Sequence, residues 1–243
     1  MEVRVVHLYP ELMSLYGSYA NVSVLRRYLE GLGHTVTVDP VSLGDAPDLA
    51  GADFVCMGAG TERASLAALD RLAPHAGALQ AAVEDGVPML FAGTAMELLG
   101  ARITEADGTE RSGLGLGAFT VKRTGKRIVG DVYGHTGAVP QAVVGFMNKC
   151  AEIDGVESPL LEEVKMGPGN HGPGTPEGFV RSGLMASELT GPLLVKNPHL
   201  LELTARRICR RRGGDWPDQP PRDPWAERGY QVTEEQLRAL AGL

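Results

Sequence analysis

The chain has 243 residues, of which 43% are hydrophobic, which is enough for one large α/β domain with at most a short appendage. Its formal net charge of −7 gives no reason to expect nucleic acid or an anionic membrane as a partner. No apolar run is long enough to span a bilayer and no secretion signal begins the chain, so we expect a cytoplasmic protein. Cys56, Cys150 and Cys209 are an odd number without CxxC spacing, which indicates neither a disulfide framework nor a zinc site.

The first half of the chain alternates strand and helix signals. Residues 3–8 are rich in β-branched side chains, residues 35–41 alternate, and residues 53–57 form a short apolar run, so each is a predicted strand. Asn21 is placed to cap a helix between the first two strands, and two further helical segments flank Pro74. This rhythm predicts an α/β fold with an open, mostly parallel sheet flanked by helices.

A glycine-rich turn follows the third predicted strand. Its sequence is GAGTER, residues 58–63, and its glycines Gly58 and Gly60 allow backbone amides to approach an anion. The turn lacks the third glycine of the dinucleotide fingerprint and the Lys-Ser/Thr of a phosphate loop, so nucleotide binding has little support.

A second turn has the shape of a nucleophile elbow. Residues 89–92 read as a buried strand, Gly93 breaks it, and residues 95–99 continue at helical spacing. Such a turn lifts one side chain above the carboxyl ends of the strands, beside helix amides that stabilise an oxyanion. Gly93 has no side chain, and its neighbour Thr94 is a poor nucleophile without a base. The pattern therefore predicts the architecture of a catalytic site without its catalyst, or an ordinary turn of a doubly wound sheet.

The second half of the chain reads as antiparallel additions to this sheet. Residues 118–122 and 127–133 are predicted as two strands joined by a hairpin turn at residues 123–126, and residues 143–146 and 164–166 continue the β character. Residues 167–178 are too rich in Gly and Pro for regular structure.

The C-terminal part is predicted to be helical with a linker. Pro198 suits the first turn of a helix, whose arginine-rich end is more typical of a solvated helix terminus than of a nucleic-acid patch. We expect residues 1–212 to form the domain and residues 213–243 to form a Pro-rich linker and a short helix, which a capping box at residues 233–236 would start.

Seven segments together resemble the class I glutamine amidotransferases of the cobyric acid synthase (CobB/CobQ) type. Within that family the likeness is greatest to the GatD-type glutaminase subunits of lipid II isoglutaminyl synthase, and it covers about residues 3–205. The segments are HLYPELMSLYG (7–17), GAGTER (58–63), PMLFAGTAMELLG (88–100), VVGFMN (143–148), GPGNHG (167–172), EGF (177–179) and LTGPLLVKNPHL (189–200). The resemblance implies a flavodoxin-like fold.

The resemblance also implies a chemistry. The family hydrolyses glutamine with a cysteine at the elbow and a histidine before the GPLL segment. It passes the ammonia to a Mur ligase-like synthetase subunit, which amidates the α-carboxyl of D-glutamate in the peptidoglycan precursor. Carried over to this chain, the cysteine position is Gly93 and the histidine position is Thr190, so both catalytic groups are absent.

Other positions implied for substrate binding are Gly58, Gly60, Thr94 and Arg127, the last for the glutamine carboxylate. The departures from the family gather at the site. The elbow continues with Thr-Ala-Met-Glu where the family has two glycines and an aromatic-Gln pair, and a GFENHGG-like segment becomes GFMNKC at residues 145–150.

Three functions are therefore weighed. The leading hypothesis is a GatD-like subunit without glutaminase activity that binds a Mur ligase-like (MurT-type) synthetase in the amidation of lipid II. The alternatives are an active glutaminase, for example with a rebuilt pair of Cys56 and His171, and a non-catalytic module that binds glutamine or another amino acid. No cofactor and no metal are expected.

The leading hypothesis makes a geometric prediction. A nucleophile elbow holds its central residue in a strained backbone conformation, which glycine adopts at little cost. We therefore expect Gly93 to have positive φ and Thr190 to lie across from it.

Overall fold

A computed structural model describes all residues, 1–243, as two six-stranded sheets with helices around them. The first sheet has the order β10-β11-β4-β3-β1-β2, and every neighbouring pair is parallel except β10 with β11. Its strands are β1 (Glu2–Leu8), β2 (Thr35–Val41), β3 (Phe54–Met57), β4 (Met89–Ala92), β10 (Phe179–Arg181) and β11 (Leu184–Ser187). The predicted open, mostly parallel sheet is confirmed.

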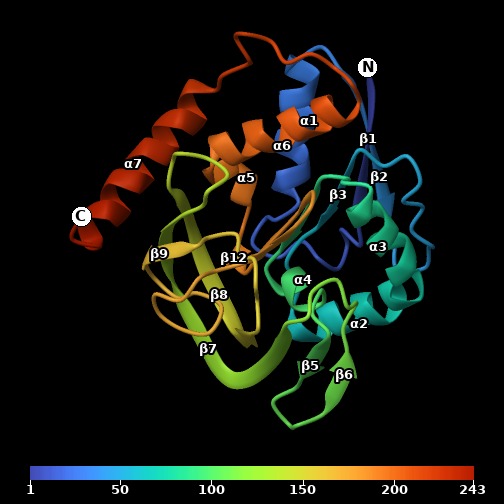
Figure 1. Ribbon diagram of the computed structural model, residues 1–243, viewed down its shortest axis with the longest axis vertical. Helices are drawn as coiled ribbons and strands as arrows, with labels where there is room; N and C mark the ends of the chain where they lie inside the picture. Colours follow the sequence, from blue (N-terminus) through green and yellow to red (C-terminus); the bar gives the residue numbers. More distant parts are fainter.

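Helices cover both faces of this sheet (Figure 1). Residues of β1 alternate between two apolar cores, because successive side chains of a strand point to opposite faces. One core contains side chains of α2 and α3, and the other contains side chains of α1 and α6. These helices are α1 (Ala20–Gly31), α2 (Glu62–Leu72), α3 (Ala76–Glu84) and α6 (Pro198–Arg211), with a 3-10 turn, η1 (Ala73–His75), between α2 and α3.

The start of α1 differs from the prediction. The helix follows Tyr19, which makes no capping hydrogen bond, and Asn21 is the second helical residue. The buried Asn21 side chain donates to the Ser18 carbonyl (3.0 Å) and accepts from the Leu194 amide (2.9 Å). Asn21 therefore joins α1 to α5 (Leu193–Lys196) instead of capping α1. Pro198 opens α6, as predicted.

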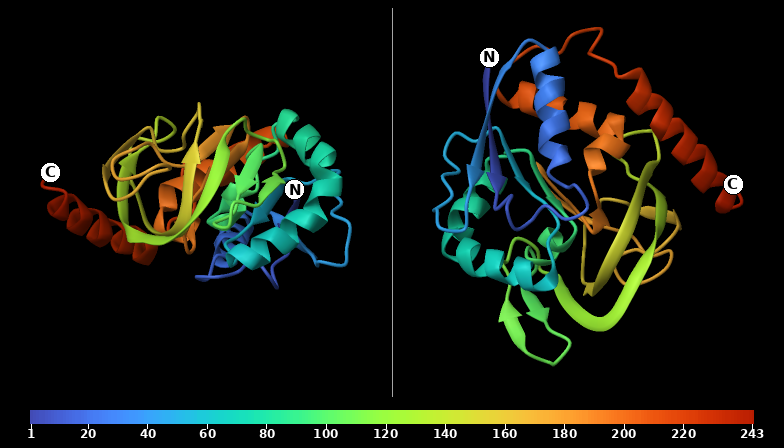
Figure 2. Two further views of the ribbon diagram at one scale, coloured as in Figure 1. Left: turned by 90° about the horizontal axis from the view of Figure 1, so that it is seen from below. Right: turned by 180° about the vertical axis from the view of Figure 1, so that it is seen from behind.

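The second sheet is largely antiparallel and has the order β12-β8-β7-β5-β6. Its sixth strand, β9, pairs with the C-terminal end of β7. Its strands are β5 (Arg102–Thr104), β6 (Glu110–Ser112), β7 (Thr120–His135), β8 (Val143–Asp154), β9 (Glu163–Met166) and β12 (Leu189–Thr190). It stands beside the parallel sheet, and Figure 2 shows its long bent strand β7 from two further sides. The predicted antiparallel additions are confirmed.

The predicted hairpin at residues 123–126 is wrong. Residues 120–135 form the single strand β7, and the same partner β8 runs along both of its halves. The pairing register shifts between Arg123 and Ile128, so the turn-forming residues make an irregularity within the strand instead of a reversal. The buried Arg123 side chain donates to Glu97 at 2.6 Å, which fixes this part of β7 against the short helix that follows β4.

The last helix begins earlier than predicted. Residues 213–223 have no helix or strand, and α7 (Pro224–Leu240) starts after Asp223, whose carboxylate accepts from the Trp225 and Ala226 amides. Thr233 lies inside this helix, and its hydroxyl donates to the Gly229 carbonyl (2.8 Å). An Asp-Pro pair therefore supplied the helix start in place of the capping box. The boundary after residue 212 falls just beyond α6 and stays a prediction.

None of these helices has the length and apolar content that a membrane crossing requires.

Candidate functional site

The turn between β4 and α4 (Thr94–Glu97) has the geometry of a nucleophile elbow. Gly93 has φ 62° and ψ −139°, a conformation that side chains strongly disfavour. A β-carbon built on Gly93 would lie 2.7 Å from the Ala59 β-carbon and 3.7 Å from Thr190 Cγ2. The expectation of positive φ at Gly93 and of Thr190 across from it is therefore confirmed. Ala59 lies closer to the elbow than the sequence indicated.

A small cavity of about 80 Å³ lies beside this turn. Small-molecule sites have volumes of about 300–1,000 Å³, so this space suits a few water molecules better than an amino acid. Ten residues line it: Leu15, Tyr16, Ala59, Gly60, Thr61, Glu62, Thr94, Arg127, Asn148 and Thr190. The structure thus brings together Gly60, Thr94, Arg127 and Thr190 from the predicted set.

Gly58 does not line the cavity. A β-carbon on Gly58 would lie 2.4 Å from the Met13 carbonyl oxygen and 2.3 Å from Ser18 Oγ. Gly58 is therefore needed for the close packing of the glycine-rich turn against the loop after β1, which is a structural role.

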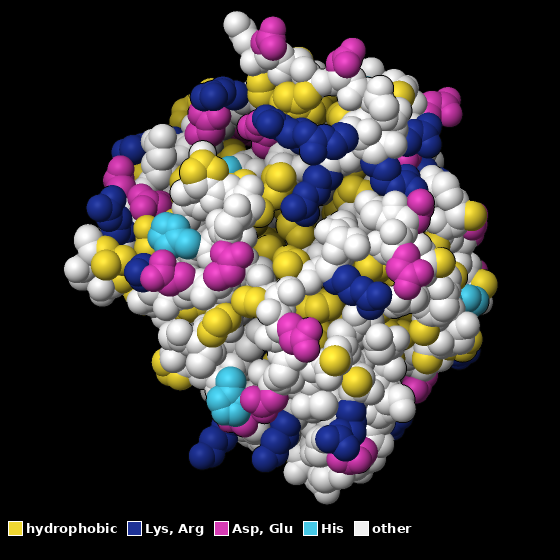
Figure 3. Space-filling view, viewed as in Figure 1, with side chains coloured by type: hydrophobic (Ala, Val, Ile, Leu, Met, Phe, Trp, Pro, Cys, Tyr) yellow, Lys and Arg dark blue, Asp and Glu magenta, His cyan; other side chains and the backbone are white.

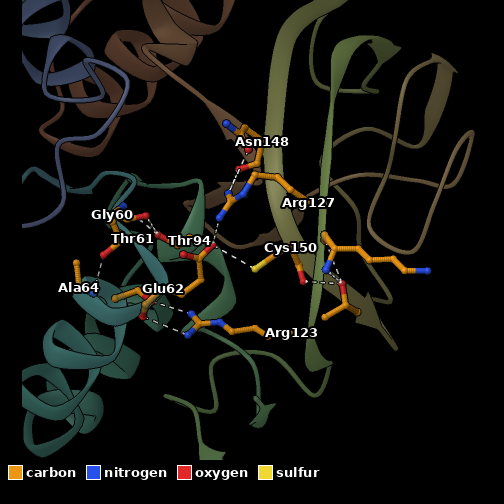
Figure 4. Close-up of polar contacts among 12 residues, drawn as sticks. Gly60, Thr61, Glu62, Ala64, Thr94, Arg123, Arg127, Asn148 and Cys150 are labelled. Atoms are coloured by element: carbon orange, nitrogen blue, oxygen red, sulfur yellow. Dashed lines mark hydrogen bonds and ion pairs between the residues drawn. The ribbon is translucent and has the colours of Figure 1, made fainter. Parts of the chain in front are cut away.

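Thr94 closes the space where an oxyanion would be bound. The Gly60 amide donates to Thr94 Oγ1 (2.9 Å), and the Thr94 hydroxyl donates to the Gly60 carbonyl (3.0 Å), as Figure 4 shows. The Gly60 amide faces the elbow and would otherwise be free to donate to a negatively charged oxygen. The Thr94 hydroxyl therefore occupies a potential oxyanion donor.

Arg127 is neutralised by a side chain of the same cavity. Its guanidinium lies 2.7 Å from Glu62 Oε1 and donates to Asn148 Oδ1 at 3.1 Å (Figure 4). Asn148 in turn donates to the Tyr16 hydroxyl (2.8 Å). A guanidinium that already pairs with Glu62 is not free to bind the carboxylate of glutamine.

The sequence reasoning missed this chain of contacts between Glu62, Arg127, Asn148 and Tyr16. All four residues lie in segments that carry the family resemblance or in the strand beside them, so the sequence could place each of them near the site. Their contacts could not be predicted, because Glu62 and Arg127 are far apart in the chain and meet only through the bend of β7.

The thiols of Cys150 and Cys56 both have raised pKa values. Cys150 Sγ donates to Glu62 Oε1 (3.1 Å), and burial together with this carboxylate raises the pKa of Cys150 to about 12. Cys56 is completely buried in β3, and burial raises its pKa to about 12. A nucleophilic cysteine needs the opposite, a thiolate stabilised by positive charge.

No histidine compensates for this. None lines the small cavity, and the exposed His171 lies with its Nδ1 2.7 Å from Asp154 Oδ1. Cys56 packs in the apolar core among side chains of α1 and α6. The structure therefore gives no support to a rebuilt Cys56–His171 pair. It also contains no cluster of His, Cys, Asp and Glu side chains suited to a metal ion.

Buried carboxylates lie behind the elbow. Glu97 of α4 forms a buried ion pair with Arg123. Glu177 accepts from the Ser187 hydroxyl (3.0 Å) and from the Glu188 amide (2.7 Å), close to the strand that carries Thr190. Burial raises the pKa of Glu177 to about 7 and raises the pKa of Glu188 well above its usual value.

The raised pKa of Glu177 predicts a pH-dependent stability. The unfolded chain releases this proton near pH 4.5, whereas the folded protein keeps it until about pH 7, so the stabilising contribution is lost as the pH rises through this window. Relative to Glu177→Gln, which stays neutral, the wild type should lose about 3 kcal/mol of unfolding free energy between pH 4.5 and 7.5. Urea unfolding of both proteins at the two pH values measures this difference.

The matched control for that experiment is Glu235→Gln, at an exposed position of α7. Its unfolding free energy should stay parallel to that of the wild type across the same pH range. If the unfolding free energies of the wild type and Glu177→Gln differ by the same amount at both pH values, Glu177 has the same pKa in the folded protein as in the unfolded chain.

Comparison with known proteins places the chain in a family. The model of the CobB/CobQ-like glutamine amidotransferase domain matches residues 4–198. The GatD subunit of lipid II isoglutaminyl synthase (glutamine-hydrolyzing) from Streptococcus pneumoniae is 31% identical over 219 residues, covering 88% of this chain and 84% of that subunit. The corresponding subunit from Staphylococcus aureus is 26% identical, covering 87% and 86%.

Two solved structures are also similar. A glutamine amidotransferase from Thermotoga maritima aligns with a TM-score of 0.49 and 11% identity, covering 99% of this chain and 94% of that one. The glutaminase domain of Trypanosoma brucei CTPS with bound acivicin aligns with a TM-score of 0.48 and 13% identity, covering 91% and 98%. The family model spans most of the chain, including both turns that meet at Gly93. The chain therefore belongs to the CobB/CobQ-like glutamine amidotransferase family.

Proposed function

We propose that this protein is a GatD-like subunit without glutaminase activity, and that it acts as the partner of a Mur ligase-like (MurT-type) synthetase in the amidation of lipid II. The observation that carries the proposal is the elbow itself. Gly93 keeps the strained turn of a nucleophile position, yet it has no side chain, and Ala59 fills the space a side chain would need. The two GatD relatives support the biological role.

Four features of the site argue together against glutamine hydrolysis. There is no nucleophile at Gly93 and no base at Thr190. The Thr94 hydroxyl caps the Gly60 amide, and Glu62 pairs with Arg127. Each feature alone would slow a glutaminase, and a cysteine hydrolase without thiolate and imidazole has no covalent step to perform. The retained architecture is then a scaffold for binding a partner.

The absence of hydrolysis is tested with a glutamine-mimicking electrophile, diazo-oxo-norleucine. We expect no labelled residue in this protein after peptide mapping and no ammonia released from glutamine. The Streptococcus pneumoniae GatD subunit serves as the positive control. A labelled cysteine or hydroxyl residue at any position would overturn the pseudoenzyme proposal and favour the active glutaminase.

The partner is tested by co-expression. A tagged copy of this chain, produced together with a Mur ligase-like protein from the same organism, should yield a stable complex through affinity and size-exclusion chromatography. In that complex, lipid II amidation should proceed with ammonium as the nitrogen source and not with glutamine. A ligase that never copurifies would count against the proposed partnership, and amidation with glutamine alone would count against the loss of hydrolysis.

A further inference from the structure

A second cavity of the molecule lies away from the elbow. It has a volume of about 390 Å³, within the range of small-molecule sites, and it shares no lining residue with the cavity at Gly93. Its walls come from α6, from the hairpin of β10 and β11, and from the two segments that follow β7 and β8. Figure 3 shows a hollow on this face of the molecule with Lys or Arg side chains at its border.

Arg207 of α6 is an unpaired cation in the wall of this cavity. Its side chain is half-buried, and it forms neither a hydrogen bond nor an ion pair. Burial lowers the pKa of Arg207, and no carboxylate lies near enough to oppose that effect. The preceding residue, Arg206, has a partner, Glu202, at 2.7 Å.

An unpaired cation that is partly removed from water costs free energy, which a bound anion would recover. A guanidinium offers a planar fork of donors that fits a carboxylate or a phosphate. Arg207 is therefore the cation of the cavity whose N–H donors have no protein acceptor.

The rest of the lining suits a small organic anion. Three hydroxyl side chains offer further donors to an oxyanion, and apolar side chains offer a surface to the body of a ligand. The hydroxyl residues are Thr136, Ser158 and Ser182, and the apolar residues are Ala138, Pro159, Leu160, Val180 and Met185.

The other charged residues of the wall are already engaged. Arg181 donates to the Leu116 carbonyl (2.8 Å) and to Gln80 (3.2 Å). Glu162 accepts from the Gly137 amide (2.6 Å), which holds its carboxylate at the neighbouring loop. The exposed Glu162 carboxylate keeps its negative charge, and Arg207 is the cation of the wall that has no partner.

We propose that this cavity binds a small molecule with an oxyanion head, a carboxylate or a phosphate, which pairs with Arg207. The hydroxyls of Ser158 and Ser182 complete the contacts to the head, and the body of the ligand lies against Leu160 and Met185. The hollow shape favours a small molecule over the flat surface of a protein. This site is independent of the function proposed above for the elbow.

The test uses the full chain and two probes, inorganic phosphate and butyrate, each titrated against chloride at equal ionic strength. The arginine Nε–Hε signals and the backbone amide signals are followed by NMR. Arg207 is assigned from the loss of its signal in Arg207→Gln, and binding by that variant is measured on the backbone amides of Ser158 and Ser182. We expect the Arg207 signal to shift and saturate with at least one probe at millimolar concentration, and the variant to bind that probe about tenfold more weakly or worse. Saturation by phosphate only, or by butyrate only, identifies the head group.

Two variants make the result decisive. Arg210→Gln, at an exposed position of the same helix, should bind as the wild type does. Ala138→Trp places a large side chain at the exposed rim of the cavity while keeping Arg207, and it should also weaken binding.

The proposal is overturned if neither probe gives a saturable shift, or if Arg207→Gln binds as the wild type does. It is also overturned if Ala138→Trp leaves affinity unchanged, because the anion would then sit on an exposed charge outside the cavity.

Discussion

Replacing Gly93 with alanine is expected to lower the free energy of unfolding by about 2–6 kcal/mol. The conformation of Gly93 costs a residue with a side chain about 1–3 kcal/mol. In addition, the new β-carbon would lie 2.7 Å from the Ala59 β-carbon, and relieving such an overlap in a packed interior costs about 1–3 kcal/mol. Urea unfolding of Gly93→Ala beside the wild type measures the sum.

Gly86→Ala is the matched control for the backbone contribution. Gly86 has φ 73°, and nothing lies within 4 Å of a β-carbon built on it. Its replacement should therefore cost only the strain of positive φ, about 1–2 kcal/mol. Equal losses in the two variants would show that Ala59 yields without cost and that the elbow is less tightly packed than the structure indicates.

A double-mutant cycle isolates the contact between Gly93 and Ala59. Ala59→Gly removes the opposing methyl group, so Gly93→Ala should be less damaging in that background by about 1–2 kcal/mol. Additive losses would mean that the two positions do not interact. The cycle thus tests directly whether Ala59 closes the elbow to any side chain.

The elbow illustrates which structural features sequence patterns predict well. The apolar run of residues 89–92, a glycine and a helical restart specify a strand-turn-helix unit, and the alternation of such units specifies a parallel sheet. These are local patterns with a fixed period, so the parallel core and the conformation of Gly93 could be predicted. The resemblance to the family added the position of Thr190.

One error arose where a long-range partner overrode a local signal. Residues 123–126 have the composition of a turn, yet pairing with β8 on both sides and the burial of Arg123 against Glu97 keep the strand continuous. At residues 233–236 the capping box was overridden by another local signal, the Asp-Pro pair that starts the helix earlier, at Asp223.

The state of the candidate site was also beyond local patterns. Its closure depends on contacts between the glycine-rich turn, the elbow and β7, which the fold brings together from three parts of the chain. The pairing of Glu62 with Arg127 and the capping of Gly60 by Thr94 became visible only with the tertiary structure.

Those contacts lead to a prediction about restoring hydrolysis. The double variant Gly93→Cys with Thr190→His should release no measurable ammonia from glutamine. The side chain of the new cysteine would overlap with Ala59. The oxyanion of the tetrahedral intermediate could not accept from the Gly60 amide, because this amide already donates to Thr94. Restoring the two catalytic side chains is therefore not enough for glutamine hydrolysis, although positions 93 and 190 face one another.

Adding Ala59→Gly and Thr94→Gly should produce activity. The first change gives the cysteine its space, and the second frees the Gly60 amide, a type of donor whose loss costs enzymes on the order of 100-fold in rate. We therefore expect the quadruple variant to exceed the double variant by at least about 100-fold in ammonia release. The Ala59→Gly, Thr94→Gly pair without the catalytic side chains is the control and should stay inactive.

The quadruple variant should still remain well below an active relative. Glu62 continues to hold Arg127, so glutamine would be bound poorly and misplaced. A displacement of about 1 Å costs on the order of 100-fold in rate. Activity in the double variant equal to that of the quadruple variant would show that Ala59 and Thr94 adapt freely, and the loss of chemistry would then rest on Gly93 and Thr190 alone.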